Sequence, residues 1–304
     1  MMLRFISKTP ILDKERSYSA RGVCMLMIII HHIVYIWGGP QCLRFTSSWG
    51  FLGTGVFFMI SGFGLYATLS NRPNLPINWI GKKLVKLLSP FLFTFLCYVA
   101  FVFFFKKSDF TVDLLSYLWQ IRIPHTTTWF LKAIIGLYVL TFFIFRFNKS
   151  NYNRVFIVVA VTGAFFAFAY LFLSAEWYWS ILNFPLGMII GLNFNTLERY
   201  VKTLNKRYYI YLGMFFCVSV ALHANVLMSL CFSVIVVVFM KFLNFSNKAF
   251  DYIGKKSINF YLFQMIFLHF GLVLCDQFYL YFLFVLLSTT ILSLIYDFIP
   301  IKGK

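Results

Sequence analysis

The feature that most constrains the fold is a series of long apolar runs separated by short polar connections. A helix needs about 20 apolar residues to cross the hydrocarbon core of a bilayer. Inside that core every backbone polar group must find a partner within the protein, and a helix provides one for each. On this rule the chain predicts an all-α integral membrane protein with about ten transmembrane helices. The candidate spans are residues 19–37, 51–69, 88–105, 129–147, 155–173, 177–194, 208–222, 224–243, 257–275 and 278–299.

Composition agrees with a membrane protein and excludes an ordinary soluble enzyme. The chain is 61% hydrophobic and 12% charged, whereas a soluble domain is about half apolar and about a quarter charged. We expect one transmembrane domain over residues 1–304, in which residues 1–18 are a cytoplasmic lead-in, and no soluble domain. A lipid bilayer is therefore the first expected partner.

The distribution of basic residues predicts the orientation. If the N-terminus is cytoplasmic, 21 of the 27 lysines and arginines fall in connections on the inner side, as the positive-inside rule requires. The pattern holds at every turn, so both termini are predicted to be cytoplasmic. The net charge of +18 is therefore explained by basic residues in the cytoplasmic connections, and we expect no nucleic-acid partner.

The cysteine pattern favours neither a metal site nor a disulfide framework. The six cysteines form no C-x-x-C pair, and most lie inside apolar runs, where thiols are usually structural. We expect no bound metal.

Two local patterns predict special structure near the inner side. Residues 78–88 have apolar side chains at helical spacing with Lys82, Lys83 and Lys86 between them, which is typical of a helix lying in the membrane interface. Pro185 lies inside the predicted span 177–194 and is expected to kink that helix and release a backbone carbonyl.

The first run contains the candidate functional residues. Ionisable groups inside a membrane helix usually face a protein interior or a watery cavity and mark function. His32 follows Arg21 by eleven residues, or about three helical turns, so the two side chains lie on nearly the same face, roughly 16 Å apart along the axis. His31 points about 80° away from Arg21. This arrangement suits a long anionic substrate lying along the helix.

Several segments in order then resemble membrane acyltransferase family 3, the multi-pass O-acyltransferases of bacterial envelope sugars. The first is Arg21 with His32, similar to the arginine and histidine of the family's first helix. The others are 55–63 (GVFFMISGF), 82–90 (KKLVKLLSP), 129–131 (WFL), 183–188 (NFPLGM) and 254–262 (GKKSINFYL). Lys83 and Lys86 stand where the family typically has arginines, and Gln264 stands where a histidine is common.

The resemblance implies an O-acyltransferase in the bacterial inner (cell) membrane. It implies transfer of an acetyl group from cytoplasmic acetyl-CoA to a hydroxyl of a cell-surface polysaccharide or exopolysaccharide sugar. His32 would be the general base, because histidine titrates near neutral pH. Arg21, Lys83 and Lys86 would bind the phosphates of the coenzyme.

The same residues could instead have structural roles. His32 could be hydrogen-bonded within the helix bundle, and the lysines could only set the topology. Arg21 could extend to the interface. The main functional alternative is a multi-pass transporter or flippase with Arg21 and His32 along a substrate or proton path.

Overall fold

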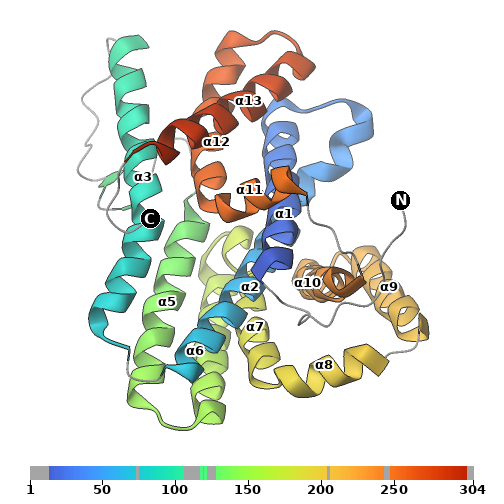
Figure 1. Cartoon of the computed structure of the whole chain (residues 1–304). Coiled ribbons are helices and arrows are strands. Elements are labelled where there is room, and N and C mark those ends of the chain that lie inside the picture. Colours follow the sequence, from blue (N-terminus) through green and yellow to red (C-terminus); the bar gives the residue numbers. More distant parts are fainter. Residues whose placement is uncertain are drawn as a thin grey trace.

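The computed structural model describes residues 14–72, 75–105, 117–118, 120–121, 128–203, 206–242 and 247–299 (Figure 1). All regular elements within these residues are helical. The α-helices are α1 Lys14–Trp37, α2 Gly50–Asn71, α3 Ile77–Phe105, α5 Trp129–Phe147, α6 Asn151–Phe172, α7 Asn183–Leu192, α8 Phe194–Thr203, α9 Lys206–Ala221, α10 Asn225–Phe242, α11 Lys248–Lys255, α12 Ser257–Leu274 and α13 Phe278–Asp297. Two 3₁₀ segments, η1 Gln41–Ser48 and η2 Ala175–Trp177, join them.

The long helices confirm the predicted fold class. Among the described residues, seven helices are long and apolar enough to cross a membrane, namely α1, α2, α3, α5, α6, α12 and α13. Three shorter apolar helices, at Asn183–Leu192, Ile210–Ala221 and Asn225–Met240, coincide with the remaining three predicted runs. The protein is therefore an all-α, multi-pass membrane protein. The number of crossings and the cytoplasmic position of both termini stay predictions.

The sixth predicted run differs from a continuous span. Residues 178–182 form a turn, and α7 comprises only 10 residues, or about 15 Å at 1.5 Å per residue. Pro185 is the third residue of α7, in the first helical turn, where a missing N–H costs no helical hydrogen bond. The predicted kink at Pro185 is therefore wrong, because this proline helps to begin a helix.

The predicted interfacial segment does not form a separate helix. Residues 78–88 belong to α3, which continues through Pro90 for 29 residues. Its length of about 43 Å exceeds the thickness of about 30 Å of a hydrocarbon core. The same helical spacing of apolar residues is compatible with either arrangement, and the structure joins the segment to the third span.

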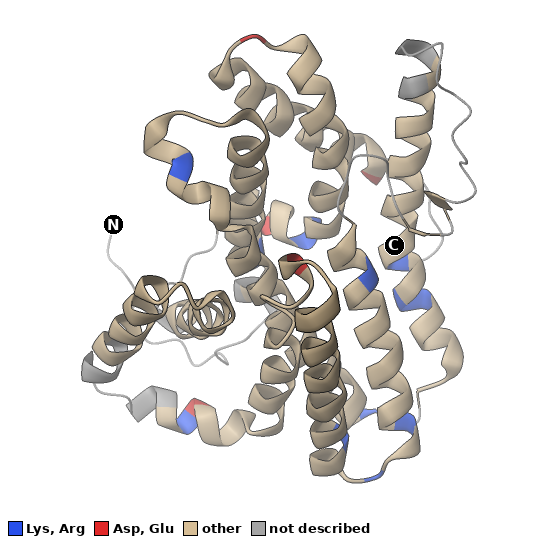
Figure 2. Ribbon diagram, turned by 180° about the vertical axis from the view of Figure 1, so that it is seen from behind, with Lys and Arg blue, Asp and Glu red and all other residues tan. Residues whose placement is uncertain are grey.

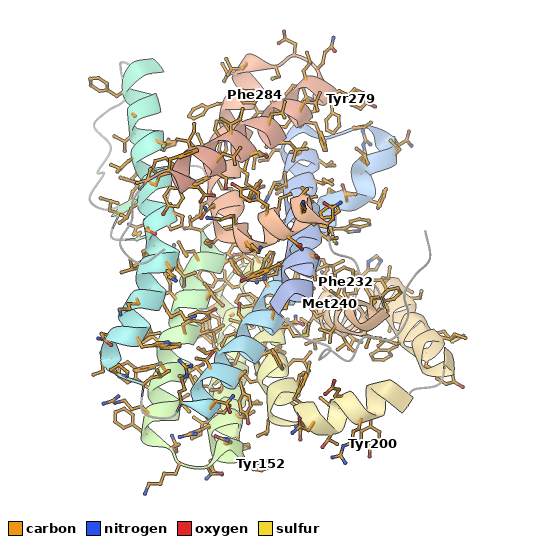
Figure 3. All side chains as sticks on the ribbon, viewed as in Figure 1. Tyr152, Tyr200, Phe232, Met240, Tyr279 and Phe284 are labelled. Carbon is orange, nitrogen blue, oxygen red and sulfur yellow. The ribbon has the colours of Figure 1, made fainter. Side chains whose placement is uncertain are left out.

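Helix α1 lies at the centre of the arrangement. In Figure 1, α12 and α13 occupy the upper part, whereas α2, α5, α6 and α7 occupy the lower part, and α3 runs beside both groups. Basic residues gather at the turn between α5 and α6, at the lower end of the molecule (Figure 2). Tyr152 and Tyr200 lie at the lower end and Tyr279 at the upper end (Figure 3), and all three are exposed, as in the aromatic belts of membrane proteins.

Two glycines let α2 and α7 touch through their backbones. A Cβ at Gly62 would overlap the carbonyl of Phe184, and a Cβ at Gly187 would overlap the carbonyl of Met59. Small residues of this kind let two helices approach closely. Inside a membrane, the resulting van der Waals packing drives helix association, because the hydrophobic effect does not.

A second close pair joins α1 to α11. A Cβ at Gly22 would overlap the carbonyl of Phe250, and one at Gly254 would overlap the carbonyl of Tyr18. The side chain of Ser19 also donates a hydrogen bond to Asp251. Helix α11 therefore fixes the part of α1 that carries Arg21.

Candidate functional site

Arg21 and His32 lie on the same uninterrupted helix. Helix α1 runs from Lys14 to Trp37 without a break, so the eleven-residue spacing corresponds to roughly 16 Å along its axis. The two side chains consequently have different neighbours. His32 lies beside a residue of α12, and Arg21 interacts with a residue of α5.

His32 faces α12. Its Nδ1 atom is buried and has no hydrogen-bond partner among the described residues, while the side chain of Gln264 lies beside the ring. Gln264 is itself fully buried, and its Nε2 donates to the carbonyl oxygen of Tyr261 at 3.3 Å. The Oε1 atom of Gln264 likewise lacks a partner in the described structure. Two interacting side chains inside the bundle therefore each have one buried polar atom without a described partner, and such atoms are costly unless a ligand or water satisfies them.

His31 is held against the beginning of α2. Its ring contacts Gly50 and interacts with the backbone of Thr46 and Ser47 in η1. The ring centroids of His31 and His32 are 5.0 Å apart. His31 therefore packs beside His32 and limits how that ring can tilt.

Arg21 reaches toward α5 and α2. Its Nε donates to the carbonyl oxygen of Ser17 at 3.1 Å, and its guanidinium lies 4.8 Å from the ring centroid of Tyr18. It also interacts electrostatically with Tyr138 of α5, which contacts Ser61 of α2. The guanidinium therefore lies close to Tyr18 of its own helix and interacts with Tyr138 of α5, which α2 contacts in turn.

A second cation shares the ring of Tyr18. The Nζ atom of Lys255, in the last turn of α11, lies 5.2 Å from the centroid of that ring. Cations are attracted to the faces of aromatic rings, so Arg21 and Lys255 both interact with the ring of Tyr18. Sequence reasoning counted Lys255 only as a topological charge, because its partner is 237 residues away in the chain.

Helix α11 is fixed in turn by α13. Lys256 forms an ion pair with Asp297, and the hydroxyl of Tyr252 lies 3.3 Å both from Oδ2 of Asp297 and from Oγ of Ser293. Burial raises the pKa of Tyr252, so its hydroxyl stays protonated and can donate to the carboxylate.

Lys83 and Lys86 are placed apart from Arg21. Both are exposed on α3, the Nζ of Lys83 lies 5.4 Å from the ring centroid of Trp79, and the two lysines repel each other. Within the described residues, Lys83 interacts with Trp79 and Lys86, and neither lysine contacts Arg21.

Comparison with known proteins identifies the family. A family model described as an acyltransferase domain matches residues 19–298. The chain belongs to acyltransferase family 3. No curated protein and no solved structure matches it.

The family-like motifs of this acyltransferase lie on helices that are packed together in the bundle. The segment 55–63 lies in α2, 82–90 in α3, 129–131 at the start of α5 and 254–262 across the junction of α11 and α12. These are helices that contact α1 or one another. No group of three or more His, Cys, Asp or Glu side chains in the described part of the acyltransferase could hold a metal ion.

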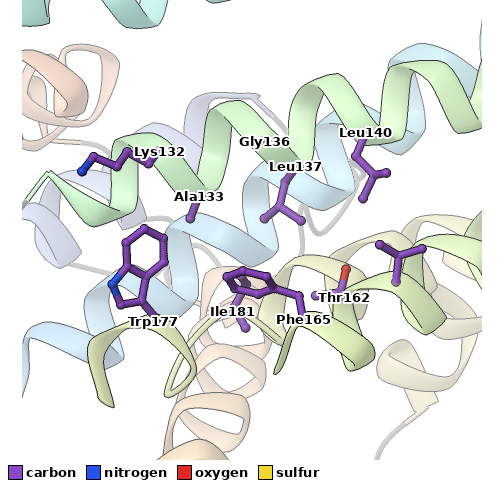
Figure 4. A pocket seen from close by; sticks show the side chains of 10 residues that line it. Lys132, Ala133, Gly136, Leu137, Leu140, Thr162, Phe165, Trp177 and Ile181 are labelled. Atoms are coloured by element: carbon purple, nitrogen blue, oxygen red, sulfur yellow. The ribbon is translucent and has the colours of Figure 1, made fainter. Parts of the chain in front are cut away.

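A cavity of about 220 Å³ lies between α5 and α6 (Figure 4), and His32 is not among the residues that line it. Its walls are almost wholly apolar, with Leu137, Phe165 and Trp177 among them, and Lys132 lines one end. The hydroxyl of Thr162 is buried there without a described partner. The acyltransferase therefore has an apolar compartment separate from the polar atoms around His32.

Proposed function

We propose that this membrane acyltransferase transfers an acetyl group from cytoplasmic acetyl-CoA to a hydroxyl of a cell-surface polysaccharide or exopolysaccharide sugar, in the inner membrane of a bacterium. The observation that carries the proposal is the buried Nδ1 of His32, which has no described partner, on a ring that interacts with the side chain of Gln264. A ring nitrogen in this condition is ready to accept a proton from a substrate hydroxyl.

His32 acts as the general base in the proposed reaction. It removes the proton of the sugar hydroxyl as the oxygen attacks the thioester carbonyl. The carbon–sulfur bond then breaks, and the leaving thiolate takes the proton from the imidazolium. The acetyl group is thereby joined to the sugar oxygen and free coenzyme A is released, with no net change in protons or electrons.

Arg21 binds the phosphates of the donor, with Lys83 and Lys86 contributing positive charge at the inner surface. A guanidinium offers a planar pair of donors to a phosphate, while lysines act as point charges. Arg21 has the stronger support of the three because it is part of a built cluster with Tyr18 and Tyr138. Lys255, on the same Tyr18 ring, adds a further charge to this cluster.

The first test is thiol release from acetyl-CoA by the purified full-length protein, with and without oligosaccharide acceptors. Acceptor-dependent release supports the transferase. The alternative is a transporter or flippase, which would move substrate across a vesicle membrane without consuming acetyl-CoA. Folded protein that neither binds nor cleaves acetyl-CoA would overturn the proposal.

Replacing Arg21 by alanine is expected to raise the KM for acetyl-CoA by about tenfold or more, with a smaller change in kcat. Hydrogen bonds to charged groups contribute about 1.5–3 kcal/mol, and a phosphate anchor acts equally in the ground state and the transition state. Steady-state kinetics at varied acetyl-CoA measures both constants.

The matched control for Arg21→Ala is Arg44→Ala, which removes an exposed arginine of η1. An equal rise in KM for the two variants would contradict a specific role of Arg21.

Replacing Gln264 by leucine is expected to lower kcat about tenfold and to leave the KM for acetyl-CoA unchanged, because Gln264 positions His32 and does not touch the donor phosphates. The pH dependence of kcat should change as well, since the surroundings of the base have changed. Gln264→His, which introduces the residue common in the family, should retain more activity than Gln264→Leu. Identical pH profiles for wild type and Gln264→Leu would contradict the positioning role.

A further inference from the structure

A second pocket, of about 410 Å³, lies where the end of α6, the turn after η2 and the α9–α10 turn meet. Tyr170, Tyr178 and Trp179 line one part of it, and His223 and Asn225 line another. It therefore combines aromatic faces with a few polar groups, unlike the apolar cavity between α5 and α6. The remaining lining residues are apolar, and small-molecule sites are generally lined in this way, by apolar and aromatic side chains with a few polar groups.

The aromatic wall is organised. The rings of Tyr170 and Tyr178 meet edge to face with centroids 5.3 Å apart, and those of Tyr178 and Trp179 meet the same way at 6.5 Å. Such geometry is favourable between aromatic rings, so the wall needs no ligand to hold its shape. It presents faces on which the apolar C–H surface of a sugar ring can lie, with hydroxyl partners at the rim.

The wall formed by the α9–α10 turn contains a residue with an uncommon backbone conformation. His223 has φ of 50°, a left-handed conformation that is uncommon for residues other than glycine and often accompanies function. The turn is held by hydrogen bonds from the N–H of His223 to the carbonyl of Val220 at 3.0 Å and from that of Ala224 to Ser219 at 2.9 Å. The chain thus keeps an imidazole at a place where glycine would fit without strain.

The pocket is connected to the site on α1 by one turn of α2. Trp179 packs edge to face on Phe51, with centroids 5.2 Å apart, and the preceding residue, Gly50, contacts His31. His31 in turn lies beside His32. The two segments that form the pocket, around residues 170–179 and 223–225, both fall on the non-cytoplasmic side in the topology predicted from the charges.

We propose that this pocket is an acceptor subsite that binds a sugar unit of the polysaccharide next to the unit that is acetylated at His32. The inference rests on the proposed function, because it assigns the pocket to the acceptor of that reaction. Binding a neighbouring unit helps to place the reactive hydroxyl, since contacts remote from the reacting atoms contribute to positioning.

The test uses the full-length protein in detergent and a fixed set of neutral oligosaccharides of glucose, mannose, galactose and N-acetylglucosamine. Saturation-transfer NMR and quenching of tryptophan fluorescence measure binding in the absence of acetyl-CoA. At least one oligosaccharide is expected to bind to wild type, and Tyr170→Ala is expected to weaken that binding about two- to tenfold, as for other aromatic contacts.

Tyr152→Ala is the matched control. Tyr152 lies on the same helix and is similarly exposed, at 70% against 64% for Tyr170, but lies at the opposite end of α6 (Figure 3). Failure of every oligosaccharide to bind, or equal weakening by both variants, would overturn the subsite. Saccharide binding that depends on Tyr170 in a protein that does not use acetyl-CoA would instead retain the pocket and remove the proposed function.

Discussion

Replacing His32 by alanine is expected to lower kcat for acetyl transfer by about 10²- to 10⁴-fold, the usual contribution of a general base. The loss should fall on kcat, because the base acts in the transition state and does not bind the coenzyme phosphates. Release of coenzyme A in the presence of acceptor measures the rate, and binding of acetyl-CoA to the variant should remain close to that of wild type.

Two further variants separate chemistry from folding. His32→Gln retains a polar side chain of similar size but cannot act as a base at neutral pH, so it should be as inactive as His32→Ala. His269→Ala removes another histidine of the membrane helices and should retain activity. Wild-type turnover by His32→Ala would remove the proposed base.

Replacing Gly62 by alanine is expected to destabilise the protein by about 1–3 kcal/mol, the usual cost of overpacking a close contact. The added Cβ would overlap the carbonyl of Phe184, and two backbones must separate to admit it. Thermal unfolding in detergent, followed by size-exclusion chromatography of the heated protein, should show a lower midpoint.

The matched control is Gly64→Ala on the same helix. A Cβ at Gly64 would meet nothing within 4 Å, so this variant should be as stable as wild type or slightly more stable, because alanine favours a helix over glycine. Equal loss of stability in both variants would show that glycine flexibility in α2, and not the contact with α7, is what matters.

The fold class could be predicted because membrane spans have a strong one-dimensional signal. Within the described residues each predicted apolar run overlaps an apolar helix, seven of them long enough to cross a membrane and three shorter, including the two on either side of His223. This signal does not predict the length or the continuity of a helix where these depend on tertiary packing. Around Pro185 the same apolar composition forms a turn and a short helix, and residues 78–88 join α3, although their pattern is equally compatible with a separate helix.

The candidate site could likewise be predicted only in part from the sequence. The alignment of Arg21 with His32 follows from helix geometry alone. The neighbours of these residues do not, because Gln264 and Lys255 come from segments more than 200 residues away in the chain. Only tertiary packing brings them to α1, and the pattern of a single sequence does not indicate which distant residue meets which helix face.

The contact between α1 and α11 has a consequence for the biosynthesis of the enzyme. Ser19 and Asp251, which join these helices, are 232 residues apart. At a synthesis rate of about 5–20 residues per second, α1 emerges from the ribosome on the order of ten seconds or more before its partner exists. Arg21 must therefore enter the membrane without Lys255 and without the backbone contact that fixes it. The end of the first helix that we propose to bind the donor is then among the last parts to be completed, so chains truncated before α11 should insert but should not retain acetyl-CoA.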